Sequence, residues 1–262
     1  NAVDKKTEYD LSIVINSLLA DHPYQLYWYD KTTESSSTGF EVSAYYDDAL
    51  EEYVAGVDGS IYISFPVADD YSAGDYLTDT SIGLSVQSSV VNAGEIIELY
   101  EDKSDYEKLC GYRDTICSLA SYNENAAAGA VSYGNPWQII WVFDEDPSTN
   151  VVCEGYAKAF RYLCDQTDFS SDISCISVTG TMAGGIGEGP HMWNIVTMED
   201  GKNYLVDVTN CDEGTVGNPD LLFLQGFDEG NYDNSYIISL SEENRILYRY
   251  DEDTLNLYPE RD

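Results

Sequence analysis

A cysteine at the start of an expected helix is the first residue in this chain whose setting suits chemistry. Cys153 follows the polar stretch DEDPSTN and lies in VVCEGYAKAF, where apolar residues then recur at helical spacing. A thiol in the first turn of a helix lies near unpaired N–H groups and the positive end of the helix dipole, and both favour the thiolate. Gly155 leaves the nearby backbone open to close approach by a substrate. The alternative is that Cys153 is a small apolar residue at the edge of a core, where free cysteines are common.

A thiolate that cleaves amides also needs a group that protonates the departing amine, and histidine suits that task. The chain has two histidines. His22 lies in the turn DHP and has the setting of a solvated loop residue, whereas His191 begins HMWNIVTM, an expected strand. The turn EDGK joins that strand to NYLVDVTN, which carries Asp207, so we expect a β-hairpin here.

The length of the hairpin loop decides whether His191 and Asp207 share a face. They are sixteen residues apart, so they lie on one face only if the loop has an odd number of residues. A three-residue loop, 199–201, meets this condition and puts Gly201 at the left-handed position of a type I turn with a G1 bulge. In that register Asp207 faces Trp193, and His191 is its diagonal neighbour within reach of a hydrogen bond. The carboxylate would then fix the imidazole tautomer and stabilise the imidazolium.

The succession VVCEGYAKAF, HMWNIV and DGKNYLVDVT resembles the transglutaminase-like branch of the papain-like cysteine enzymes, in particular a bacterial secreted or surface type. These enzymes carry a cysteine at a helix start and a histidine and an aspartate on following strands. The resemblance implies that Cys153 is the nucleophile, His191 the general base and acid, and Asp207 the orienting carboxylate. Three motifs in the right order make it far more specific than any one of them.

The resemblance extends to the residues that follow the histidine. Trp193 and Asn194 match the family's habit of an aromatic and a polar residue at these positions, and we expect them, with Gly155, to line a substrate cleft. Asn210 is a departure, because the family often has tryptophan three residues after the aspartate. This change puts one wall of the cleft in doubt.

The elements around these motifs indicate an α+β fold, in which residues 101–262 form a transglutaminase-like (papain-like) domain of helices packed on an antiparallel sheet. Ser104 and Glu107 form an S-x-x-E capping box, which predicts a helix running to about Tyr122. The segment GTMAGGIGEGP, residues 180–190, is rich in glycine and precedes the histidine. We expect it to be a mobile loop that borders the cleft.

Residues 1–100 are expected to form an accessory domain of one helix and a small sheet, with the domain boundary near residue 100. Leu11, Ile15, Leu18 and Leu19 recur at helical spacing, and the helix should stop at Pro23. Four short runs between residues 24 and 91 have the composition of strands. These runs are YQLYWY, FEVSAYY, IYISFPV and IGLSVQSSVV.

The charge of the chain excludes several classes of partner. Twelve Lys and Arg face 48 Asp and Glu, and the net charge of −36 repels phosphate backbones and anionic lipid surfaces. The sequence has no run of 18 apolar residues, so we expect no insertion into a membrane. The acidity, the 23 tyrosines and the first residue, Asn, favour an extracellular or cell-surface location. The oligomeric state stays open.

Burial as small hydrophobic residues is the commoner fate of cysteines such as the five besides Cys153, and a protein of this size does not need disulfides to stabilise its core; the disulfide state stays open. Cys110 and Cys117 are seven apart on one expected helix, about 10 Å along its axis, and cannot pair with each other. A zinc site built from Cys153, His191 and Cys211 lacks a C-x-x-C element, and the acidic runs lack calcium-ligand spacing. We therefore expect no metal and no cofactor.

The reaction expected from these residues is acyl transfer on an amide bond of a peptide or protein substrate. Water as the acceptor would make the chain a peptidase or amidase, and a lysine-like amine would make it a cross-linking transglutaminase; the same residues serve both. The backbone N–H of Cys153 is one natural oxyanion donor, and the second stays open. The alternative from another class is a non-catalytic surface binding or scaffolding protein that retains these residues.

Overall fold

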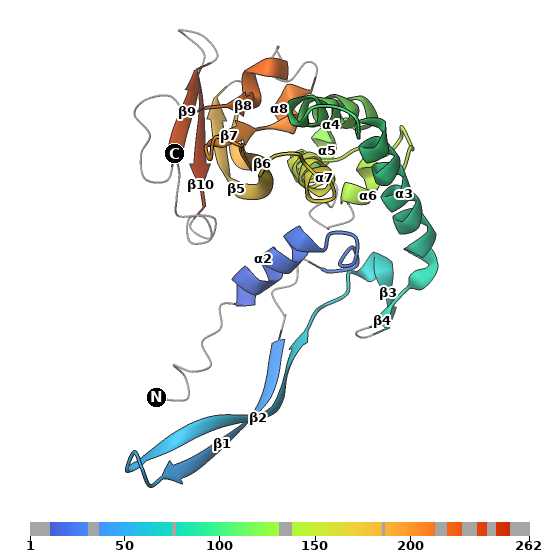
Figure 1. Cartoon of the computed structure of the whole chain (residues 1–262). Coiled ribbons are helices and arrows are strands. Elements are labelled where there is room, and N and C mark those ends of the chain that lie inside the picture. The colour runs from blue at the N-terminus through green and yellow to red at the C-terminus, as the bar shows by residue number, and fades with distance from the viewer. Residues whose placement is uncertain are drawn as a thin grey trace. The chain divides into compact units, whose positions relative to one another are not determined.

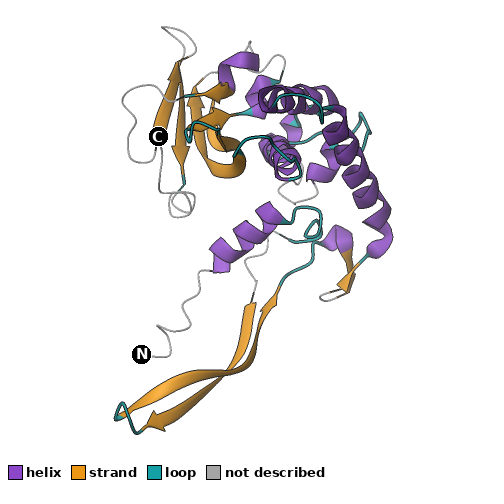
Figure 2. Cartoon of the chain, in the orientation of Figure 1, coloured by secondary structure: helices purple, strands orange, loops and turns teal. Residues whose placement is uncertain are grey.

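The computed structural model describes residues 11–30, 37–74, 77–130, 138–184, 187–212, 219–226, 235–239 and 245–251. The chain divides into two compact units, Asn1–Ile82 and Gly83–Asp262, and each is described by itself (Figure 1). Helices and strands both contribute to each unit, in agreement with the α+β class (Figure 2). Within the described ranges, no helix is both long and apolar enough to cross a lipid bilayer.

The first unit begins with the predicted amphipathic helix. Helix α2 spans Leu11–Asp21 and ends before Pro23, which cannot continue a helix. Ile15 and Leu19 are buried on one face of α2 and pack with Tyr29 in a small core. The predicted helix is therefore confirmed, with Ile15 and Leu19 buried and Leu18 half-buried, while the side chain of Leu11 lies outside the described residues.

A long two-stranded hairpin follows in the first unit. Strands β1 (Ser37–Asp47) and β2 (Glu52–Ser64) are antiparallel, with Tyr46 opposite Tyr53. The run YQLYWY was expected to be a strand, but the structure has turns there and a single bridge between Tyr29 and Val67. The remaining elements of this unit are short: β3 (Ser72–Gly74), β4 (Leu77–Thr78) and 3-10 turns at Asp69–Tyr71 and Thr80–Ile82.

The run IGLSVQSSVV, expected to be a strand, lies largely in a helix of the second unit. Helix α3 spans Gly83–Leu99, so the boundary between the units lies at residue 82 instead of near residue 100. Its Val and Ile content favours a strand, but tertiary packing overrides that preference. Ser89, Ala93 and Ile96 form one buried stripe, and the Ser89 hydroxyl donates to the Ile140 carbonyl at 3.3 Å.

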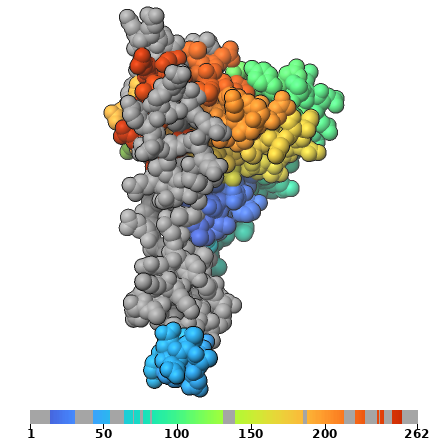
Figure 3. All heavy atoms as spheres, turned by 60° about the vertical axis from the view of Figure 1, so that its left-hand side comes forward, coloured from blue at the N-terminus to red at the C-terminus, as the bar shows by residue number. Residues whose placement is uncertain are grey.

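The other helices of the second unit gather around the one that carries Cys153. Helix α4 (Asp105–Leu119) begins at the predicted capping box, in which Ser104 and Glu107 bond reciprocally. Helix α7 (Cys153–Asp165) packs against α4. In the space-filling view the green, yellow and orange parts of the second unit form one continuous surface (Figure 3). The shorter helices are α5 (Glu124–Ala127), α6 (Gln138–Val142) and α8 (Val208–Cys211).

An antiparallel sheet forms the other layer of the second unit. Its described strands follow the order β8-β7-β6-β5-β10-β9, and α7 packs on β5 and β6. A short 3-10 turn, Pro219–Leu222, precedes β8. The strands span Ser174–Gly184 (β5), Gly187–Thr197 (β6), Asn203–Val206 (β7), Phe223–Gln225 (β8), Ser235–Ser239 (β9) and Arg245–Tyr250 (β10).

The glycine-rich segment 180–190 differs from its prediction as a mobile loop. Residues 180–184 and 187–190 form the paired ends of β5 and β6, with Gly184 opposite Gly187, and residues 185 and 186 lie outside the described residues. Gly180 has a packing role, because an added Cβ would lie 1.9 Å from the backbone oxygen of Arg249. The absence of a side chain at Gly180 thus lets β10 lie close to β5.

Candidate active site

The hairpin of β6 and β7 has the register predicted from sequence. Thr197 pairs with Asn203, which leaves a short loop that ends near Gly201. Gly201 has φ +73°, the left-handed conformation that the predicted three-residue loop requires. His191 and Asp207 therefore lie on the same face of the hairpin, as the predicted loop length requires.

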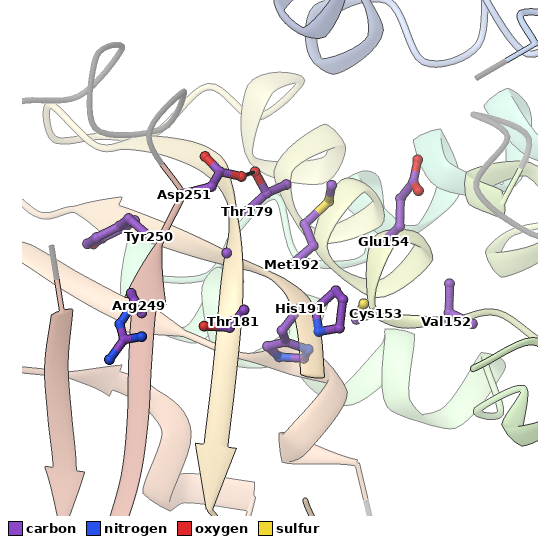
Figure 4. A pocket seen from close by; sticks show the side chains of 12 residues that line it. Val152, Cys153, Glu154, Thr179, Thr181, His191, Met192, Arg249, Tyr250 and Asp251 are labelled. Atoms are coloured by element: carbon purple, nitrogen blue, oxygen red, sulfur yellow. Dashed lines mark hydrogen bonds between the residues drawn. The ribbon is translucent and has the colours of Figure 1, made fainter. Parts of the chain in front are cut away.

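His191 and Asp207 form a buried pair. The Nε2 atom of His191 lies 2.8 Å from Oδ2 of Asp207. The side chain of Asp207 is fully buried, and His191 is 9% exposed. The thiol of Cys153 contacts the same imidazole, and both residues line one cavity (Figure 4). Because Nε2 is engaged by Asp207, the other ring nitrogen, Nδ1, is the one left for the thiol.

Each member of this pair favours the charged form of the other. Burial on its own would lower the pKa of His191, but the charge and hydrogen bond of Asp207 and the contact with Cys153 raise it to about 10. Burial would likewise raise the pKa of Asp207, but the charge and hydrogen bond of His191, with further hydrogen bonds from Asn210 and Tyr248, lower it. At neutral pH the pair is therefore an imidazolium and a carboxylate.

We expect the His191 ring to titrate near pH 10 in the folded protein, well above the ordinary value of about 6.5. Its contribution to stability is then complete below about pH 6.5 and is lost as the pH rises through about 10. Ring NMR measures this directly, because the chain has two histidines, of which His191 is buried and His22 is exposed. A midpoint at or below about 6.5 for His191 would contradict the ion pair.

The carboxylate of Asp207 accepts hydrogen bonds from two further residues that the sequence did not indicate as its partners. Asn210 donates its side-chain Nδ2–H to Oδ2 at 2.7 Å and its backbone N–H to Oδ1 at 3.2 Å. The hydroxyl of Tyr248, on β10, donates to Oδ2 at 2.7 Å. Asn210 stood out as a departure from the family pattern, whereas Tyr248 has no local sequence signal that relates it to a residue 41 positions earlier.

Trp193 and Asn194, expected to line the cleft, lie beneath it instead. Trp193 is 1% exposed and its ring stacks on His191 with centroids 5.9 Å apart. Asn194 is fully buried, and its side-chain amide donates to the Ala157 carbonyl at 3.0 Å, which attaches β6 to α7. Their roles are to support the imidazole and to fix the helix on the sheet.

Gly155, also expected at the cleft, is a packing position. A Cβ at this residue would lie 2.6 Å from the Cβ of Val151. The small residue therefore lets the first turn of α7 fold tightly against the preceding segment. Its contact is with the protein interior rather than with an open space for substrate.

A cavity of about 550 Å³ opens at the thiol. Its walls come from the start of α7 and from β5, β6 and β10, and they include Thr181, Met192 and Arg249 (Figure 4). Cys153 is half-buried at this cavity. An extended peptide segment of a few residues fits a volume of this size.

All six cysteines, each of which lies in the described part of the chain, are free thiols. Burial raises the pKa of Cys117 to about 12, and it raises the pKa of Cys110, Cys164 and Cys211 as well. Cys153 differs from them in that it lines the cavity beside an imidazolium. Within the described ranges, no group of three or more His, Cys, Asp or Glu residues could hold a metal ion.

Comparison with known proteins gives little further information. No protein-family model and no curated protein matches the chain. A solved structure titled "Crystal structure of a TGase" is similar with a TM-score of 0.37 and 15% identity, over 74% of this chain. This chain spans 47% of that protein, about half of its length. A likeness this low carries no argument about fold or activity.

Proposed function

We propose that this chain is a thiol-dependent acyltransferase acting on amide bonds, with a transglutaminase-like, papain-like core. Cys153 is the nucleophile, His191 the general acid and base, and Asp207 the carboxylate that orients it. The observation that carries the proposal is the buried His191–Asp207 pair at 2.8 Å, next to a half-buried thiol at an open cavity. A partly exposed thiol beside a cationic imidazole, which a buried carboxylate holds in place, is what a cysteine nucleophile needs.

The chemistry follows from the charges. The imidazolium of His191 stabilises the Cys153 thiolate, which attacks the amide carbonyl carbon. The tetrahedral intermediate collapses as His191 gives its proton to the departing amine, and a thioester remains on Cys153. His191, now neutral, takes a proton from water or from a second amine as that nucleophile attacks the thioester. The acyl product leaves, and the thiolate and imidazolium are restored.

The start of α7 offers stabilisation for the oxyanion. Val152, the residue before the helix, has an apolar side chain that makes no capping hydrogen bond to it. In this proposal the N–H of Cys153 and the positive end of the helix dipole stabilise the carbonyl oxygen as it gains charge. Helix α7 thus supplies both the nucleophile and part of the stabilisation.

The substrate we propose is a peptide or protein segment, reached outside the cell or at its surface. A second role, binding by the first unit, is favoured by one observation: the β1–β2 hairpin exposes tyrosines near its tip. Tyr45, Tyr46 and Tyr53 are 56%, 49% and 75% exposed. Exposed aromatic side chains that gather in this way are typical of recognition surfaces.

The test is mass spectrometry of a glutamine- and lysine-containing peptide library after incubation with the protein, with and without an added primary amine. Cleaved peptides identify a peptidase, deamidated side chains an amidase, and amine adducts a transglutaminase. Cys153→Ala is the control and should abolish every product. The absence of all three changes with the native protein, under reducing conditions that keep Cys153 free, would contradict the proposal.

A further inference from the structure

The Oδ2 atom of Asp207 accepts hydrogen bonds from three side chains at once. His191 Nε2 lies at 2.8 Å, Asn210 Nδ2 at 2.7 Å and the Tyr248 hydroxyl at 2.7 Å. A protonated carboxyl group has one hydroxyl that donates, so it accepts fewer hydrogen bonds than an ionised carboxylate. The cluster therefore matches the ionised form of Asp207.

Tyr248 is placed in this cluster by the geometry of β10. Tyr248 is fully buried, and its ring packs against Trp193 at 5.2 Å and His191 at 6.2 Å between centroids. The glycine at 180 allows β10 to come close enough for this contact, since any side chain there would meet the backbone of Arg249. The tyrosine thus shields the pair from water and aims a donor at the carboxylate.

We propose that Tyr248 is a positioning residue of the site: its hydroxyl keeps Asp207 ionised and aimed at His191. The hydrogen-bonded cluster is present whether or not the chain catalyses a reaction. Only the catalytic purpose that we assign to Tyr248 rests on the proposed function. Tyr248 contacts Asp207 through its hydroxyl and His191 through its ring, and it does not line the cavity at the thiol, so it acts through the pair. The competing interpretation is that the carboxylate merely satisfies a buried hydroxyl.

The two interpretations differ in their dependence on pH. A hydroxyl that stabilises the carboxylate is effective only while Asp207 is ionised, so its loss makes Asp207 easier to protonate. A hydroxyl that is merely satisfied bonds either form of Asp207 equally, because it can also accept a hydrogen bond from the protonated carboxyl group, and so contributes the same stability at every pH. The ring resonances of His191 report the protonation of Asp207 as an acid-side step, because Nε2 is hydrogen-bonded to that carboxylate.

The experiment is NMR titration of the His191 ring in the full chain, for wild type and Tyr248→Phe. Tyr156→Phe is the matched control, because it removes another buried tyrosine hydroxyl that donates to a carboxylate, Asp212, at 2.8 Å. We expect Tyr248→Phe to move the acid-side step upward by about one pH unit, as loss of one hydrogen bond to a charge implies. Tyr156→Phe should leave the step unchanged.

A second variant is expected to shift the acid-side step of the His191 ring in the opposite direction. Site-specific difluorotyrosine at position 248 keeps the hydroxyl and makes it a stronger donor, so the step should move to lower pH. An equal step in wild type and both variants would overturn the positioning role. The NMR titration needs no turnover, so its result is independent of acyl-transfer activity. A shifted acid-side step in a chain without acyl transfer refutes the proposed function alone. An unshifted step in an active chain refutes the role of Tyr248 alone.

Discussion

Replacing Asp207 with asparagine is expected to slow the labelling of Cys153 by iodoacetamide about 30-fold or more at pH 7. Without the carboxylate charge, burial dominates at His191, and its pKa falls below the ordinary value instead of standing near 10. The thiol then lacks a cationic partner, and an ordinary thiol is only about 3% ionised at neutral pH. Any amide turnover should fall further, by about 10⁴-fold, because the uncharged residue neither stabilises the imidazolium nor fixes its tautomer.

The control for this variant is Asp212→Asn. Asp212 accepts a buried tyrosine hydroxyl in the same unit, but it is not a partner of His191. Its loss should leave labelling of Cys153 close to the wild-type rate. Equal labelling rates in Asp207→Asn and wild type, with both variants folded by circular dichroism, would contradict the role of Asp207.

The stability of Asp207→Asn should differ from wild type in a pH-dependent way. The folded-state pKa of Asp207 is lowered, so its charge contributes stability above the unfolded value of about 3.9 and loses it as the pH falls through the folded value. Urea unfolding should therefore show a larger gap between the two proteins at pH 6 than at the acid limit of folding.

Replacing Gly180 with valine is expected to destabilise the protein by about 3 kcal/mol, at the upper end for an overpacked interior. An added Cβ would lie 1.9 Å from the backbone oxygen of Arg249 and 3.0 Å from Cη2 of Trp193. The clash involves backbone, so β10 must move, and the hydroxyl of Tyr248 must move away from the carboxylate. The loss is measured by urea unfolding at pH 7 together with the labelling rate of Cys153.

Gly189→Val is the matched control for this substitution. Gly189 is a strand glycine on β6, and a Cβ there meets no atom within 4 Å. Valine also suits a strand, so this variant should be close to neutral. A similar loss of stability in both variants would show that close approach of β10 does not explain Gly180.

The local features of this fold were predictable from sequence, and one long-range register was too. The side-chain alternation of strands and the glycine of a three-residue loop fix which residues share a face, so the pairing of His191 with Asp207 follows from the sequence. The capping box at Ser104 and the helix that starts at Cys153 follow from equally local rules.

The remaining features depend on contacts between distant segments. Helix α3 has strand-like residues and is helical because its small buried stripe packs against α6. The glycines at 180–190 indicated a loop, but two of them serve close strand packing. Tyr248 belongs to a strand whose partner in the sheet is far away in sequence, so no spacing rule links it to Asp207.

The central claim is that Cys153 is an activated nucleophile paired with His191. The measurement that tests it most directly is the rate of iodoacetamide labelling between pH 4 and 9, with peptide mapping to separate Cys153 from the other five thiols. We expect Cys153 to label fastest of the six thiols at neutral pH, and His191→Ala to remove this advantage. Labelling of Cys153 no faster than that of Cys110, with the same rise toward alkaline pH in both proteins, would contradict it.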